Sequence, residues 1–193
     1  MNATQITHHD LDGYGASTVV ASYLPLSTIV HVPRYADVGP VVESELKRLG
    51  SATDPELLLI TDLGLEDVTI KFIRSFTALN RRRHPAAQHR LIVLDHHASS
   101  LDRLVAHDLA PSSEDGATKT FNLGDPNIVV LIDVSRCATR IAYEHRALYA
   151  TREGRGRDTC SVVRSWSASM TQDRRGTPGQ TQRAERCSTH FGN

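Results

Sequence analysis

The pattern of apolar and polar positions in the first 150 residues predicts strands that alternate with helices. Five short segments are β-branched or continuously apolar, which is typical of strands, and the apolar runs match strands covered on both faces. The predicted strands are Thr4–His8, Thr28–Val32, Glu56–Thr61, Arg90–Leu94 and Asn127–Asp133.

Between these strands, apolar residues recur at steps of three and four, which predicts helices. The predicted helices are Tyr14–Leu24, Val38–Leu49, Leu65–Leu79 and Arg136–Tyr149. The segment Ser112–Asp125 is polar and is expected to be an exposed loop. This order predicts an α/β fold, with a parallel five-stranded sheet that carries helices on both faces.

A change of composition divides the chain after Ala150. Residues 1–150 contain 14 Lys and Arg against 18 Asp and Glu, whereas residues 151–193 contain 8 Arg, no Lys and 4 acidic residues. The second segment has no Leu, Ile or Tyr, so it cannot bury enough apolar area to offset its chain entropy. We predict one domain over residues 1–150 and a disordered, low-complexity tail over residues 151–193. A basic arm that binds nucleic acid and a shifted reading frame are the alternatives for the tail.

The composition excludes several classes of protein. The 193 residues carry 22 Lys and Arg against 22 Asp and Glu, so the whole chain is not a protein that coats polyanions. No apolar run approaches the roughly 18–20 residues that span a bilayer, and the N-terminus has no signal pattern. The cysteines Cys137, Cys160 and Cys187 are odd in number and widely spaced, which indicates no disulfide framework. We expect a cytoplasmic protein without a membrane partner, and the sequence leaves its oligomeric state open.

Acidic and histidine residues follow three of the predicted strands. The first strand leads into THHDLDGYGA, the third into LLLITDLG and the fourth into VLDHHAS. Because the carboxyl ends of parallel strands share one edge of a sheet, we expect these side chains to meet there. The candidate residues are His8, His9, Asp10, Asp12, Asp62, Asp95, His96 and His97.

The four aspartates would repel one another at that edge, and the motifs supply no cationic side chain beside them. Divalent cations are the simplest compensation. Imidazole together with carboxylate suits Mn²⁺ or a similar first-row ion, and Mg²⁺ less well. Two ions about 3.5–4 Å apart that share a carboxylate could generate hydroxide and hold a phosphoryl group. The turns between strands and helices contain no glycine motif that would cradle a dinucleotide or a nucleoside triphosphate.

Each candidate also has a simpler interpretation. Asp62 could be a turn or cap residue, the His8–His9 pair could fill surface or core, and Asp95 could cap a helix. The glycines of the first motif could serve only a tight turn. The joint placement of these residues at three strand ends nevertheless favours a metal site.

The segments THHDLDGYGA, LLLITDLG and VLDHHAS resemble the first three motifs of the DHH phosphoesterase superfamily, and VVLIDVSRCATRIAYEH resembles its later strand and helix. The resemblance covers about residues 3–150. The superfamily includes RecJ-type single-strand exonucleases, oligoribonucleases, cyclic-dinucleotide phosphodiesterases and manganese-dependent pyrophosphatases.

The resemblance implies two Mn²⁺ ions, with Mg²⁺ and Co²⁺ as alternative ions, and it assigns five side chains to them. His8 and Asp10 would bind one ion, and Asp12 and His96 the other. Asp62 would bridge the two ions.

The resemblance also implies a catalytic pair. His97 would face the substrate phosphate and polarise it, Asp95 would orient its neighbours, and His9 would support the ligands. A fourth motif of the superfamily, an Asp beyond the helix that is predicted to end near Ala150, has no counterpart here, because Asp133 lies before that helix. The C-terminal substrate domain with its Gly-Gly-Gly-His stretch is also missing, so we expect a truncated domain with impaired activity.

The function implied by the resemblance is a Mn²⁺-dependent phosphoesterase that hydrolyses phosphodiester bonds of short oligonucleotides or single-stranded nucleic acid. Two alternatives are also enzymes, a cyclic-dinucleotide phosphodiesterase and a pyrophosphatase-like hydrolase. The third alternative is a catalytically inactive module that binds nucleic acid or metal.

Overall fold

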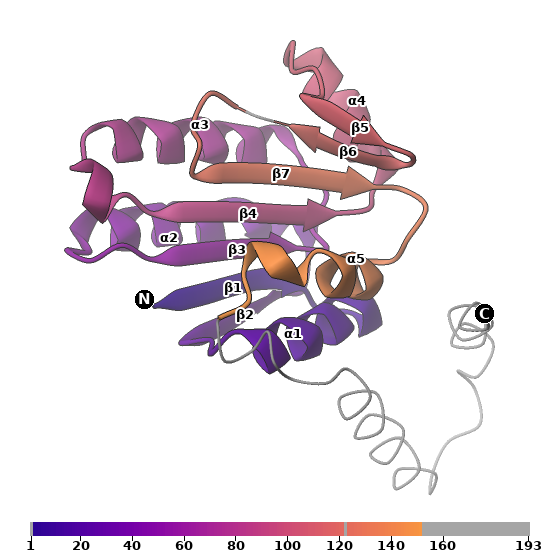
Figure 1. The fold of residues 1–193 in the computed structure, drawn as a ribbon, viewed down its shortest axis with the longest axis horizontal. Helices are drawn as coiled ribbons and strands as arrows, with labels where there is room; N and C mark the ends of the chain where they lie inside the picture. Colours follow the sequence, from indigo (N-terminus) through magenta and orange to yellow (C-terminus); the bar gives the residue numbers. More distant parts are fainter. Residues whose placement is uncertain (1, 122, 152–193) are drawn as a thin grey trace, which may run out of the picture. The chain divides into compact units, whose positions relative to one another are not determined.

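The computed structural model describes residues 2–121 and 123–151, which form one seven-stranded sheet with helices packed against it (Figure 1). In chain order the strands are β1 (Ala3–His8), β2 (Thr28–Val32), β3 (Leu57–Thr61), β4 (Arg90–Asp95), β5 (Ser113–Asp115), β6 (Thr118–Phe121) and β7 (Ile128–Asp133). Their order across the sheet is β2-β1-β3-β4-β7-β6-β5.

The five strands predicted from the apolar pattern are all present, and β2, β1, β3, β4 and β7 pair in parallel. The α/β class is therefore confirmed. The predicted number of strands is wrong, because the expected loop Ser112–Asp125 contains the hairpin β5–β6, which continues the sheet antiparallel to β7. The three residues of β5 are exposed and only Phe121 of β6 is buried, so this hairpin carries no apolar pattern.

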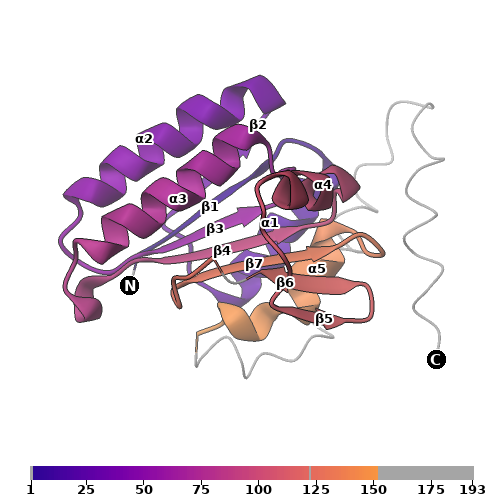
Figure 2. The same cartoon turned by 90° about the horizontal axis from the view of Figure 1, so that it is seen from above.

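Helices cover both faces of the sheet, as predicted (Figure 2). The helices α1 (Leu11–Tyr23) and α5 (Ala138–Glu144) pack on one face, and α2 (Val38–Ser51) and α3 (Asp67–Arg81) pack on the other. Neighbouring residues of β3 alternate between the two layers, since Leu58 packs with the α2 and α3 side and Leu59 with the α1 and α5 side. All of β3 is buried, which explains its continuous apolar run.

Several helix ends differ from the predicted ones. α1 begins three residues before the predicted Tyr14, because the Asp10 carboxylate accepts a hydrogen bond from the Gly13 N–H and caps the helix. α5 ends at Glu144 and is followed by a 3₁₀ turn. An additional short helix, α4 (Ala98–Ala106), lies in the polar segment after β4, where no helix was predicted.

The chain turns from β7 towards α5 at Asp133, whose carboxylate is fully buried and holds the turn together. It accepts hydrogen bonds from the Ser135 N–H at 2.9 Å, from the Thr118 hydroxyl at 2.8 Å and from the Arg136 guanidinium. Burial alone would raise the pKa of this carboxyl, but the hydrogen bonds outweigh it and lower the pKa to about 2. Asp133 thus fixes the start of α5, which reaches the candidate site described below.

No helix in the described part of the chain is long and apolar enough to cross a membrane. Of the predicted tail, only Thr151 is described, and its N–H donates to the Tyr23 carbonyl at 3.0 Å. The prediction of disorder for the rest of the tail falls on residues 152–193, which lie outside the described residues.

We expect Asp133→Asn to lower the free energy of unfolding by about 2 kcal/mol at neutral pH. The folded state stabilises the charged Asp133 carboxylate more than the unfolded state does, and asparagine removes that charge. The pKa of Asp133 is lowered from 3.8 to about 2, so its stabilisation is complete above the higher value and is lost as pH falls towards the lower one. The difference from the unmodified protein should therefore shrink to roughly half near pH 3. Urea unfolding near pH 7 and pH 3 measures this. Asp102→Asn, at an exposed position of α4, is the control and should show little effect at either pH.

Candidate metal centre

The three motifs meet at one edge because their strands are neighbours in the sheet. β3 lies between β1 and β4, and all three run in parallel. The register pairs Thr7 with Thr61 and Thr61 with Leu94, so the residues that follow these positions emerge at the same level. Figure 1 shows the arrowheads of β3, β4 and β7 on the same side of the molecule. The residues that follow β1, β3 and β4 therefore lie at one edge of the sheet.

Two overlapping groups of side chains have donor atoms close enough to hold a cation. Asp62, His96 and His97 form one group, and His8, Asp10 and Asp62 form the other; within each group the donor atoms lie within 4.8 Å of one another. We call them the first and second donor groups. Asp62 belongs to both, which is the placement that a bridging ligand requires.

Within the groups, imidazole nitrogens contact carboxylate oxygens directly. His96 Nε2 lies 3.0 Å from Asp62 Oδ1, and His8 Nδ1 lies 2.9 Å from Asp10 Oδ2. The contact with Asp62 raises the pKa of His96. Burial alone would raise the pKa of the Asp10 carboxyl. The hydrogen bonds from the Gly13 N–H and from His8 outweigh burial and lower that pKa to about 2.

Asp62 combines a left-handed backbone conformation with a buried carboxylate. Its φ of 57° is in the left-handed region, which an aspartate tolerates better than most residues, and its N–H donates to the Leu94 carbonyl at 3.1 Å. The side chain is 2% exposed, and its Oδ2 atom is buried without a hydrogen-bond partner among the described residues. Burial is the main cause that raises the pKa of Asp62 to about 6, and the neighbouring carboxylates Asp12 and Asp10 add to it.

A divalent cation fits this arrangement. Among residues 2–121 and 123–151, no lysine or arginine forms an ion pair with Asp10, Asp12, Asp62 or Asp95. The buried Asp62 Oδ2 atom has a free lone pair where a cation would take one, and the mixture of carboxylate oxygen and imidazole nitrogen suits a first-row divalent ion. The identity of the ion stays a prediction.

His97 is held by a buried carboxylate. Asp95 is fully buried; its Oδ1 accepts from His97 Nδ1 at 2.7 Å, and its Oδ2 accepts from the Ser100 hydroxyl. The Ser100 oxygen in turn accepts from the Leu65 N–H at 2.8 Å. The contact with Asp95 raises the pKa of His97. The other ring nitrogen of His97, Nε2, lies 3.1 Å from the Tyr35 hydroxyl. Asp95 therefore contacts His97 directly, and its role in orienting that ring stays a prediction.

Asp12 lies beside the first donor group but makes most of its contacts elsewhere. Its Oδ2 is 3.7 Å from His96 Nε2. The same carboxylate accepts from the Ala138 N–H at 2.6 Å, the Thr139 N–H at 2.9 Å and the Thr139 hydroxyl at 2.7 Å. Asp12 thus joins α1 to the start of α5 and lies outside both donor groups, and its role as a ligand stays a prediction.

The glycines of the first motif allow close approach of backbones and do not form a tight turn. Gly13 and Gly15 both lie inside α1. A Cβ atom on Gly13 would lie 2.1 Å from the His8 carbonyl oxygen, and one on Gly15 would lie 2.2 Å from the Thr139 hydroxyl. The interpretation of these glycines as turn residues is therefore wrong. They let α1 pack directly against the end of β1 and against α5.

His9 belongs to neither donor group. Its ring lies edge-on to the Tyr14 ring, with centroids 5.3 Å apart, and its N–H donates to the Val32 carbonyl at 3.0 Å. Sequence reasoning missed Tyr35, Ser100 and Thr139, which contact His97, Asp95 and Asp12. These residues come from separate turns and helix starts, and no periodic pattern in the sequence marks them.

We expect Asp62→Asn to weaken Mn²⁺ binding at both cation positions, because Asp62 belongs to both donor groups. Asparagine keeps the shape of the side chain and tolerates the left-handed backbone, so the fold should remain. The loss of affinity should be at least about tenfold, since even residues outside the first coordination shell commonly contribute that much. Isothermal titration with Mn²⁺ measures both stoichiometry and affinity.

Two further variants separate the positions. His8→Gln should weaken only one of the two binding steps, because His8 belongs to the second donor group alone. Asp54→Asn, at an exposed position before the amino end of β3, is the matched control and should bind Mn²⁺ as the unmodified protein does. Loss of both binding steps in His8→Gln, or of neither in Asp62→Asn, would contradict the sharing of Asp62.

Comparison with known proteins yields a fold and no family. No known protein family matches the sequence, and no curated protein matches it either. Among solved structures, the chain is similar to an uncharacterized protein from Helicobacter pylori G27, with a TM-score of 0.57 and 19% sequence identity. The similarity covers 78% of this chain and 37% of that protein, so the chain spans little more than a third of the other's length. The shared feature is the mixed α/β sheet fold.

Proposed function

We propose that this chain is a phosphoesterase domain of the DHH type, which uses two Mn²⁺ ions to hydrolyse phosphodiester bonds of short oligonucleotides or single-stranded nucleic acid. The observation that carries the proposal is the pair of donor groups that share the buried Asp62. Two cation positions joined by one carboxylate are the arrangement that in-line phosphoryl displacement uses in two-metal enzymes. The sequence motifs that resemble the superfamily contribute every member of both groups.

When bound, the ions would supply Lewis acidity and compensate the negative charge of the phosphoryl group. The chain's own residues would hold them, His8 and Asp10 on one side, His96 on the other, and Asp62 between them. His97, the third member of the first donor group, would hold no ion in this arrangement. It would present Nε2 to a phosphoryl oxygen, which would take the place of the Tyr35 hydroxyl that now lies 3.1 Å from that nitrogen. Asp95 would keep that ring oriented through Nδ1 and favour its protonated form, so that Nε2 can donate a hydrogen bond to the developing charge.

The choice of a phosphodiester over other phosphoryl substrates follows from the first motif. Its sequence, HHDLDGYG, is more similar to the oligonucleotide-cleaving members of the superfamily than to the pyrophosphatases. Cyclic dinucleotides and pyrophosphate remain the alternative substrates. The position of Asp12, which is bonded to α5 outside both donor groups, favours a second candidate function, a module that binds metal or nucleic acid without turnover.

The experiment that tests the proposal measures bound Mn²⁺ and hydrolysis in the same sample. The full chain is incubated with a five-nucleotide single strand, a cyclic dinucleotide or pyrophosphate, each with Mn²⁺ and with a chelator. We expect hydrolysis of the single strand that needs Mn²⁺. Asp62→Asn and His97→Asn should each reduce it at least about 100-fold, because each removes a group that acts on the transition state.

The remaining results decide between the alternatives. Asp54→Asn, far from the strand ends that carry the site, should hydrolyse the strand at the unmodified rate. Hydrolysis of the cyclic dinucleotide or of pyrophosphate in preference to the strand would transfer the proposal to that substrate. Two bound ions without hydrolysis of any of the three substrates would establish the inactive binding module instead.

A further inference from the structure

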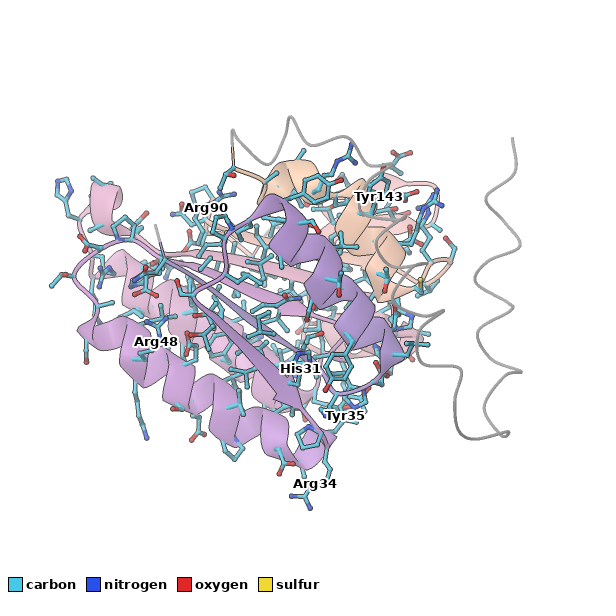
Figure 3. All side chains as sticks on the ribbon, turned by 90° about the horizontal axis from the view of Figure 1, so that it is seen from below. His31, Arg34, Tyr35, Arg48, Arg90 and Tyr143 are labelled. Carbon is cyan, nitrogen blue, oxygen red and sulfur yellow. The ribbon has the colours of Figure 1, made fainter. Side chains whose placement is uncertain are left out.

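Aromatic rings gather beside the candidate metal centre, towards the outer strand β2. Tyr14, on α1, stacks on His31 of β2 with ring centroids 4.2 Å apart and an angle of 27° between the planes. Tyr35, in the 3₁₀ turn η1 (Tyr35–Asp37), stacks on His8 with centroids 5.3 Å apart and an angle of 23°. β2 pairs with β1 so that Thr7 lies opposite His31 and His8 lies opposite Val32, which places both ring pairs at the same end of these strands. Figure 3 labels His31 and Tyr35. We call Tyr14, His31, Tyr35 and His8 the aromatic shelf.

The two tyrosines of the shelf are only half covered by the protein. Each is 43% exposed, although a large aromatic side chain gains free energy when it is buried. One face of each ring packs on an imidazole, and His9 lies edge-on to both Tyr14 and His31. The rings are therefore held in place before any ligand arrives, which lowers the cost of stacking a further flat group on them.

The shelf is connected to the donor groups by direct contacts. The Tyr35 hydroxyl lies 3.1 Å from His97 Nε2, and His8 is itself a member of the second donor group. A phosphoryl group held at the centre would therefore keep its substituents next to the Tyr35 ring, which belongs to the shelf.

A nucleotide has the two chemical parts that this combination would bind. Its phosphate suits the cation positions, and its base is a flat ring system that stacks on aromatic side chains. Such stacking tolerates all four bases, because every base has a π-face. Pyrophosphate carries no ring and would gain nothing from the shelf.

We propose, resting on the phosphoesterase function above, that Tyr14 and Tyr35 stack on nucleobases of an oligonucleotide whose phosphodiester lies at the metal centre. The shelf selects nucleotides over ring-free phosphoryl compounds and has little preference among the bases. Tyr14 and Tyr35 are thus binding residues for the substrate's bases, and His31 and His8 support their rings from behind.

The test is a binding measurement that does not depend on turnover. A dinucleotide that contains 2-aminopurine is titrated with the full chain in Mg²⁺, and its fluorescence is followed, since stacking quenches this base. Affinity for the same dinucleotide with both bases removed is measured by competition. We expect saturable quenching, and an affinity for the dinucleotide with bases about tenfold or more above that for the abasic one.

Three variants locate the effect. Tyr14→Leu and Tyr35→Leu keep an apolar side chain but remove the ring, so each should reduce the ratio of the two affinities about tenfold. Tyr35→Phe keeps the ring and removes only the hydroxyl that contacts His97, so the ratio should be retained. Ile29→Ala is the matched control, since Ile29 is 40% exposed on the same strand as His31 but belongs to no ring contact.

The outcomes separate this inference from the proposed function. Equal affinity for the two dinucleotides, absence of quenching, or an unchanged ratio in both leucine variants would overturn the shelf, even if the single strand is hydrolysed. Quenching and base-dependent affinity without hydrolysis would support the shelf while the phosphoesterase proposal fails. A strong preference for one base would overturn the statement that the shelf tolerates all bases.

Discussion

The buried carboxylate of Asp62 has to be compensated at an edge of the sheet that the chain's own lysines and arginines do not reach in the described residues. The donor oxygens of Asp10 and Asp62 lie within 4.8 Å of each other, and at that limit an effective dielectric constant of about 20 gives a repulsion of about 3.5 kcal/mol between the two carboxylates. A hydrogen bond from a charged partner such as His96 stabilises the Asp62 carboxylate by about 1.5–3 kcal/mol. This stabilisation does not offset the repulsion from Asp10 and Asp12 together with the cost of burying the charge. The raised pKa of Asp62 expresses this deficit, and a pair of divalent cations would remove it.

The fold creates this concentration of charge through simple topology. Parallel pairing of β1, β3 and β4 brings together residues that are more than 80 positions apart in the chain, such as Asp10 and Asp95. The surrounding contacts then fix the side chains in different ways. Asp95 is buried and turned towards His97, whereas Asp12 is turned towards α5. Aspartates that all follow strand ends therefore have different partners: Asp95 contacts His97, and Asp12 contacts the start of α5.

Much of this architecture could be predicted from the sequence, because apolar runs such as Leu57–Thr61 report burial on both faces directly. The hairpin β5–β6 could not be predicted, since its residues are mostly exposed and its pairing depends on the edge that β7 offers. The convergence of the motifs followed from the strand order. The left-handed backbone of Asp62 and the contact of Tyr35 with His97 did not, because both depend on turn geometry that no residue spacing encodes.

The bond between Asp12 and α5 has a consequence for the order in which the molecule can assemble. The partners of the Asp12 carboxylate, Ala138 and Thr139, follow it by more than 120 residues. During synthesis on the ribosome, α1 emerges early. Its contact surface for α5, which includes Gly15, stays uncovered until residues 138 and 139 have been translated. The packing of α1 therefore depends on the last helix of the domain. A nascent chain that stops before β7 and α5 would lack the hydrogen bonds that hold Asp12 in place.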